Sequence, residues 1–231
     1  AGFLSVSAQT YNEWIDKSFE CIESEDWTGA EKALIGALRV QPANPQNALL
    51  LSNLGTIQRK MGKNDEALKS YTNALMITPR SVTLLMNRAA LFSEMEKFDD
   101  ALKDYNQVLM LDDKEEDALY LRGLIRLEKN DTTACRKDFE QLLKINPKSS
   151  NARIGLAALM KLRGYYTEAI DLYTQVIRVN PEQTSLYLNR GEAYLLNLRL
   201  NKADEDVAKA FPNLKILLAH GCYPFVQEAC H

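Results

Sequence analysis

Apolar residues along this chain recur at intervals of three and four, the spacing that places side chains on one face of an α-helix. One such run is made of Leu50, Leu51, Leu54, Ile57 and Met61, and the next of Ala67, Leu68, Tyr71, Ala74 and Leu75. Gly62, Lys63 and Asn64 separate the two runs, and glycine and asparagine favour turns over helix interiors. The pattern predicts two helices joined by one short turn.

The same pattern returns every 34 residues. A small residue stands at Ala67, Ala101, Cys135, Ala169 and Ala203, and Ala30 precedes this column by 37 positions. A second small column is Gly55, Ala89, Gly123, Ala157 and Gly191; an aromatic column is Tyr71, Tyr105, Phe139 and Tyr173; and Pro79, Asp113, Pro147 and Pro181 close the units. Five units in register make the chain an array.

The columns divide the chain into six helix pairs, with three extra residues, 45–47, between the first two. The predicted repeats are 11–44, 48–81, 82–115, 116–149, 150–183 and 184–212. Asn146-Pro147 and Asn180-Pro181 stop the second helix of a repeat before the next repeat begins. One helix pair cannot bury both its faces, so neighbouring repeats are expected to stack.

This arrangement resembles the tetratricopeptide repeat (TPR), a 34-residue helix pair ending in proline. The second repeat carries the clearest match, at Leu51, Leu54, Gly55, Gly62, Ala67, Tyr71, Ala74 and Pro79. The resemblance covers 11–212 and implies an all-α fold, an α-solenoid or superhelix of stacked antiparallel helix pairs with a concave inner surface. Small residues at Gly55 and Ala67 would let the two backbones approach, with the Tyr71 ring filling the space beyond.

The resemblance also implies a peptide-binding groove lined by the first helix of each repeat. An asparagine five residues past the repeat start often bonds the backbone of a bound extended peptide in this family, and Asn53, Asn87 and Asn189 match it. Leu121 and Gly155 interrupt this polar line. The apolar groove candidates are Met86, Tyr120, Leu121, Leu124, Ile154 and Leu188. The alternative for these apolar residues is packing between helices.

One use of this fold in chaperone adaptors is a clamp of lysines and arginines for a C-terminal carboxylate pair. This chain departs from it, since Thr83 and Asp117 stand where the clamp would carry basic residues. Capture of an acidic tail is therefore not expected. Arg88 and Arg190 follow asparagines directly, about 100° round the helix, and are expected to be solvated or paired within their own helix.

Composition excludes several functional classes. Hydrophobic residues make up 46% and charged residues 26%, which is ordinary globular content, and no apolar stretch is long enough for a membrane span. A net charge of -3 without a basic block argues against nucleic acid as a partner. The sequence has no phosphate loop, no Gly-x-Ser-x-Gly and no His-Glu-x-x-His, so no enzyme activity, catalytic residue or cofactor is expected.

The two ends do not fit the repeat. Residues 1–10 are typical of the end of an export signal, with Val6-Ser7-Ala8 shaped like a cleavage site, which favours an exported, periplasmic bacterial protein. The alternative is a frayed start of a cytoplasmic protein. The apolar tail, 213–231, holds Cys222 and Cys230, for which free thiols are favoured over a disulfide, and no metal site is expected there.

Two hypotheses on function follow. The first is a scaffold that holds an extended segment of another protein or a peptide in the groove. The second is a structural module that assembles copies of itself, as a homodimer, through the apolar tail or the end of the array. The favoured role of the tail is to fold back over the last repeat as a cap. Cys135, in the small-residue column, is expected to be a buried and unreactive thiol.

Overall fold

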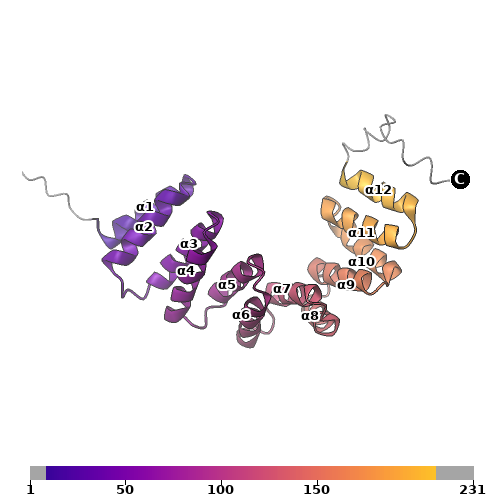
Figure 1. Cartoon of the computed structure of the whole chain (residues 1–231), viewed down its shortest axis with the longest axis horizontal. Helices are drawn as coiled ribbons and strands as arrows, with labels where there is room; N and C mark the ends of the chain where they lie inside the picture. The colour runs from indigo at the N-terminus through magenta and orange to yellow at the C-terminus, as the bar shows by residue number, and fades with distance from the viewer. Residues whose placement is uncertain (1–8, 212–231) are drawn as a thin grey trace, which may run out of the picture. The chain divides into compact units, whose positions relative to one another are not determined.

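The computed structural model describes residues 9–211, which form twelve α-helices and contain no strand (Figure 1). The helices are α1 (Tyr11–Glu23), α2 (Trp27–Val40), α3 (Asn47–Lys60), α4 (Asn64–Ile77), α5 (Val82–Glu94), α6 (Phe98–Leu111), α7 (Glu116–Glu128), α8 (Thr132–Ile145), α9 (Ser150–Leu162), α10 (Tyr166–Val179), α11 (Thr184–Leu196) and α12 (Leu200–Ala210). The all-α prediction is confirmed. Residues 1–8 of the predicted export segment and the whole tail, with Cys222 and Cys230, lie outside the described residues.

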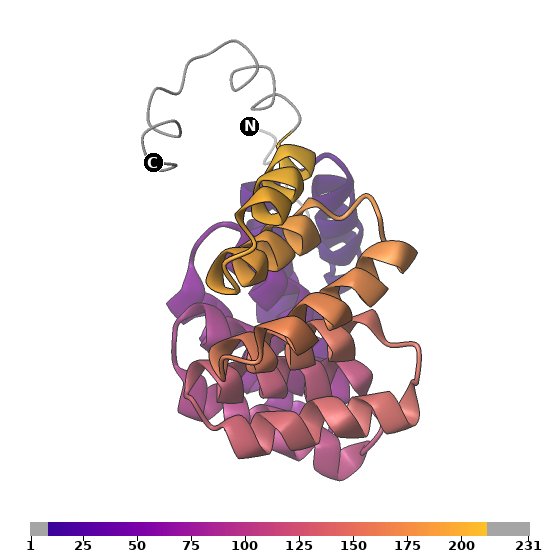
Figure 2. The ribbon, with the colours of Figure 1, turned by 90° about the vertical axis from the view of Figure 1, so that its right-hand side faces the viewer.

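The described residues form two compact parts, an N-terminal part up to Ala118 and a C-terminal part from Leu119, and the division falls inside α7. In the N-terminal part α1 packs on α2, α3 on α4 and α5 on α6, and each pair packs on the next. In the C-terminal part α9, α10, α11 and α12 lie in chain order, each against the one before it (Figure 2). Helix pairs packed in sequence order are the architecture that the repeat predicted.

The repeated columns form the core of each part. The aromatic side chains Tyr71, Tyr105, Phe139 and Tyr173 are fully buried, and so are Ala30, Ala67, Ala101, Cys135 and Ala169. Gly55 shows why one column must be small, because a Cβ at this position would lie 2.7 Å from the Tyr71 ring. The predicted burial of Cys135 is confirmed, and burial raises the pKa of its thiol.

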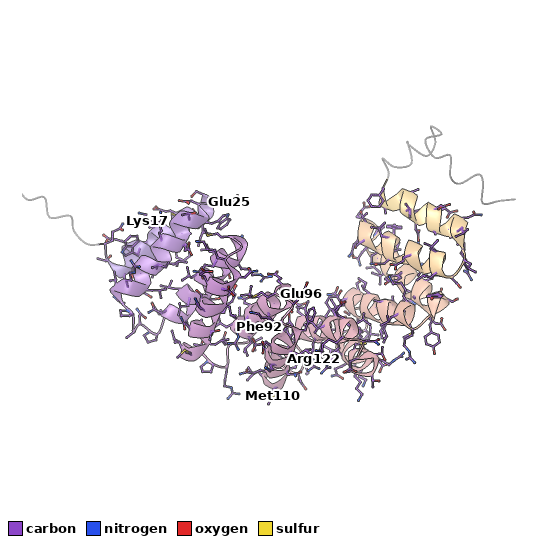
Figure 3. The ribbon with its side chains drawn as sticks, in the orientation of Figure 1. Lys17, Glu25, Phe92, Glu96, Met110 and Arg122 are labelled. Atoms are coloured by element: carbon purple, nitrogen blue, oxygen red, sulfur yellow. The ribbon has the colours of Figure 1, made fainter. Side chains whose placement is uncertain are left out.

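Each helix pair turns through one residue in the left-handed region, where φ is positive. These residues are Glu25, Gly62, Glu96, Asn130, Gly164 and Leu198, with φ between 57° and 80°. Figure 3 marks Glu25 and Glu96 at two of the turns. Glycine adopts this conformation without strain, whereas other residues adopt it at a cost. The turn geometry is therefore kept in every repeat even where the sequence does not supply glycine.

A buried ion pair joins the two helices of three repeats. Arg88 donates two hydrogen bonds to Asp104, at 2.7 and 2.8 Å, from α5 to α6. The corresponding pairs, 16 residues apart in the sequence, are Arg122 with Asp138 and Arg190 with Asp206. The three aspartates are buried. The prediction that Arg88 and Arg190 are solvated or paired within one helix is wrong, because their planar guanidinium groups reach across to a carboxylate on the second helix.

Candidate functional site

All nine residues predicted to line a groove lie on first helices and are half-buried. They are Asn53 on α3, Met86 and Asn87 on α5, Tyr120, Leu121 and Leu124 on α7, Ile154 on α9, and Leu188 and Asn189 on α11. Among residues 9–211, the three asparagine amides have no hydrogen-bond partner. Each amide therefore keeps its donor and acceptor for a group outside these residues. Their role in binding stays a prediction.

Three of the apolar candidates belong to the packing of the C-terminal part. Tyr120 and Leu124 contact the buried cluster that contains Phe139, and the rings of Tyr120 and Phe139 lie 6.3 Å apart. Burial raises the pKa of the Tyr120 hydroxyl. Ile154 packs against the cluster that contains Tyr173. These side chains hold helices together, as the alternative interpretation of the sequence expected.

Gly155 explains why the line of asparagines is interrupted in the fifth repeat. A Cβ at this position would collide with the ring of Phe139, which projects from α8. An asparagine could stand there only if the ring moved. Tight packing of the aromatic column therefore excludes the polar side chain at this point.

A pocket of ≈ 590 Å³ opens farther along the first helices of the C-terminal part. Its lining residues are Leu127 and Glu128 from the end of α7, Asn130 from the turn that follows, Ala158, Lys161 and Leu162 from α9, and Glu192 and Leu196 from α11. Leu162 is 54% exposed and Leu196 is 45% exposed. The volume falls within the range of roughly 300–1,000 Å³ that is typical of ligand pockets.

Seven of the eight lining residues occupy three repeat positions, one to two turns beyond the predicted asparagines, and Asn130 lies in the turn after α7. In the C-terminal part these positions hold Leu124, Ala158 and Glu192; Leu127, Lys161 and Leu195; and Glu128, Leu162 and Leu196. On α3 and α5 they hold Thr56 and Ala90, Arg59 and Ser93, and Lys60 and Glu94, and on α1 they hold Phe19, Ile22 and Glu23. At these positions the first helices of the C-terminal part are leucine-rich, whereas α3 and α5 are polar and α1 carries Ile22 and the 50% exposed Phe19. The sequence contains this difference, but the resemblance to the TPR family predicts binding at the asparagine position, which lies on an earlier turn of each first helix.

One ion pair joins two of the residues that line the pocket. Lys161 donates to Glu192 at 2.5 Å, from α9 to α11, and its side chain is only 19% exposed. Glu128 is exposed and has no ion-pair partner within the part of the chain that the structure describes. Because Glu192 neutralises Lys161, the uncompensated charge among the lining residues is negative. In the N-terminal part Arg59 and Glu94 form an ion pair between α3 and α5.

Metal-binding arrangements are not evident in residues 9–211. No group of three or more histidine, cysteine or acidic side chains there is placed to hold a metal ion. None of the described helices combines the length and the apolar character that a bilayer crossing requires. Helix pairs stacked in chain order define the class of helical-repeat proteins.

Comparison with known proteins identifies the family. TPR family profiles match residues 50–83, 117–149 and 158–212. A TPR protein from Parabacteroides merdae is 40% identical over 87% of this chain and 79% of its own, with a TM-score of 0.83. The chain belongs to the TPR family, whose members are generally non-catalytic and bind proteins or peptides.

Two more distant structures share the fold. PilF of Pseudomonas aeruginosa is 16% identical over 87% of this chain and 92% of its own, with a TM-score of 0.68. YrrB, described as a TPR protein with an unusual peptide-binding site, is 18% identical over 84% of this chain and 100% of its own, with a TM-score of 0.59. No curated protein sequence matches this chain.

Proposed function

We propose that this chain is a non-catalytic scaffold and that the pocket formed by α7, α9 and α11 holds a segment of a partner protein. The observation that carries the proposal is the exposure of Leu162 and Leu196 at the edge of that pocket. Each leucine still presents about half of its surface to water, and covering that surface is favourable. The half-buried amide of Asn189, on the same helix as Leu196, is available to bond a peptide backbone.

A peptide selection on the whole chain tests this proposal. Random 12-residue peptides displayed on phage are selected, and the affinity of the enriched peptides is measured by fluorescence anisotropy. We expect Leu162→Asp to weaken binding at least tenfold, because a charge replaces an apolar contact. Met110→Asp is the matched control, since Met110 is 85% exposed on α6 and its side chain points away from the helices (Figure 3). Equal loss in both variants, or no enriched peptide, would refute the proposal.

A second candidate function is self-association through the C-terminal end of the array. Phe211 is 48% exposed and Val207 is half-buried. The equivalent positions in the fifth repeat, Tyr173 and Ile177, are buried and pack in one cluster with Leu186 of the next helix. The end of α12 therefore presents apolar surface of the kind that a further helix covers inside the array.

Sedimentation equilibrium over a wide range of concentration tests self-association. A dimer that dissociates in Phe211→Asp would support this second function, whereas a monomer at every concentration would exclude it. Removing residues 212–231 separates the remaining explanation. If the apolar tail caps the end of α12, the intact chain is monomeric and the shortened chain associates or loses stability.

A further inference from the structure

The chemistry of the pocket lining restricts the kind of segment that fits. Four of the eight lining residues are apolar, Leu127, Ala158, Leu162 and Leu196, and none is aromatic. They come from three successive first helices, so the apolar surface is continuous across α7, α9 and α11. A surface of this kind is complementary to a large apolar side chain and offers few hydrogen bonds to a small polar one.

The charges at the pocket are arranged asymmetrically. Lys161 is the one basic lining residue, and its ammonium group is held by Glu192 at 2.5 Å. Its small exposed fraction, against 56% for Glu192, leaves the carboxylate as the more accessible member of the pair. Glu128 adds a second accessible carboxylate on the α7 side. A ligand therefore meets one unpaired carboxylate, Glu128, and the exposed side of Glu192, whose charge is balanced by the only basic lining residue.

We propose, building on the scaffold function above, that this pocket selects a segment with a large apolar side chain next to a lysine or arginine. The apolar side chain contacts the leucines, and the neighbouring cation lies near Glu128 and Glu192. An acidic segment is disfavoured, because its carboxylates would face Glu128 and would compete with Glu192 for Lys161. This preference is opposite in sign to a clamp for C-terminal carboxylates.

The selected peptides provide the first test. We expect the enriched 12-residue sequences to combine Leu, Ile, Met or Phe with Lys or Arg within two positions, and to be depleted of Asp and Glu. Binding should weaken as sodium chloride is raised from 50 to 500 mM, because exposed charge pairs are screened. Enrichment of acidic sequences, or of apolar sequences without any charge preference, would overturn the proposal.

Charge reversal in the protein provides the second test. Glu128→Lys should weaken a selected basic peptide about fivefold, and should strengthen the same peptide carrying Glu in place of its Lys or Arg. Glu182→Lys is the matched control, because Glu182 is exposed in the turn between α10 and α11 and the net charge changes equally. The circular dichroism of each variant is compared with the parent chain to confirm folding.

The outcomes separate this inference from the scaffold function. If Leu162→Asp abolishes binding while Glu128→Lys and Glu182→Lys have equal effects, the pocket binds peptides but does not select by charge. If Leu162→Asp has no effect on any selected peptide, both proposals are wrong. A dimer that dissociates in Leu162→Asp would identify a second copy of the chain as the occupant and would overturn the charge preference.

Discussion

The ion pair between Arg88 and Asp104 allows a quantitative test of how the repeats are held together. We expect Asp104→Leu to destabilise the chain strongly, because it leaves the Arg88 guanidinium with one long hydrogen bond, to Thr72 at 3.4 Å. We expect Arg88→Leu with Asp104→Leu to be nearly neutral. The fifth repeat already carries leucine at both equivalent positions, Leu156 and Leu172, and each packs against a core cluster.

The magnitudes follow from the burial of the two groups. Removing one partner of a buried ion pair costs roughly 3–5 kcal/mol, whereas replacing both by well-packed apolar residues is often neutral. The Arg88 side chain is 20% exposed and retains some contact with water, so we expect about 3 kcal/mol for Asp104→Leu. The Asp104 side chain is 5% exposed, so Arg88→Leu should cost about 4 kcal/mol. The double variant should lie within about 1 kcal/mol of the parent chain.

Urea unfolding measures these differences. Far-ultraviolet circular dichroism reports on all the helices, while the two tryptophans, Trp14 and Trp27, report on the first helix pair. Coincidence of the two transitions shows whether the array unfolds as one unit, which repeat proteins do not always do. If the double variant loses as much stability as the two single variants together, the leucines do not replace the ion pair and the reasoning fails.

Three further predictions follow from single residues. Gly62→Ala should lower the free energy of unfolding by about 1 kcal/mol, because φ is +74° there and the strain comes from the backbone alone, with nothing within 4 Å of the new Cβ. Glu96→Gly should raise the free energy of unfolding by about 0.5 kcal/mol, because φ at Glu96 is +57° and glycine relieves the strain. Urea midpoints measure both changes, and the opposite signs would contradict the strain argument. Desolvation raises the pKa of Glu31, but hydrogen bonds from Lys63 and Gln58, together with the Lys63 charge, outweigh it and lower the pKa below 4.5. The ionised Glu31 side chain therefore stabilises the fold above that pH, and this contribution is lost as the pH falls through the lowered pKa. The stability difference between the parent chain and Glu31→Gln should therefore shrink from pH 6 to pH 3, and a constant difference would exclude the linkage. Because burial raises the pKa of Cys135, peptide mapping after treatment with a thiol reagent should find it unmodified until urea unfolds the chain.

The fold could be predicted from the sequence because its determinants are repeated. One helix pair is weak evidence, but five copies in register fix the period, the small column and the aromatic column together. Cys135 illustrates the strength of this argument, since its position in the alanine column was enough to predict its burial. Equivalent residues make the core contacts in each repeat, so a wrong assignment of helices in one repeat would disagree with the pattern in the others.

The pattern within a single helix does not predict the ion pairs, because the partner of each arginine lies on the next helix. An exposed position beside an asparagine suggests a solvated side chain, yet the carboxylate that receives Arg88 lies 16 residues later on the next helix. The sequence indicates these partners through two repeat positions that vary together. Arginine at the position of Arg88 and aspartate at the position of Asp104 occur together in the third, fourth and sixth repeats, and neither occurs at these positions in the second and fifth. Comparing columns two at a time would have found the partners.

The pocket could not be located from the family pattern because the residues that line it differ from one repeat to the next. The buried columns are alike in both parts, so they do not require a leucine-rich surface in one of them. Lys60 and Glu94 occupy the same repeat position as Leu162 and Leu196, which shows that the fold accepts a charge there. Leucine at an exposed position that tolerates charge gives up favourable hydration, and about half of the Leu162 and Leu196 side chains remains uncovered among residues 9–211. A contact with something beyond those residues would cover the remaining apolar surface, and this is the physical reason for proposing a binding site on α7, α9 and α11.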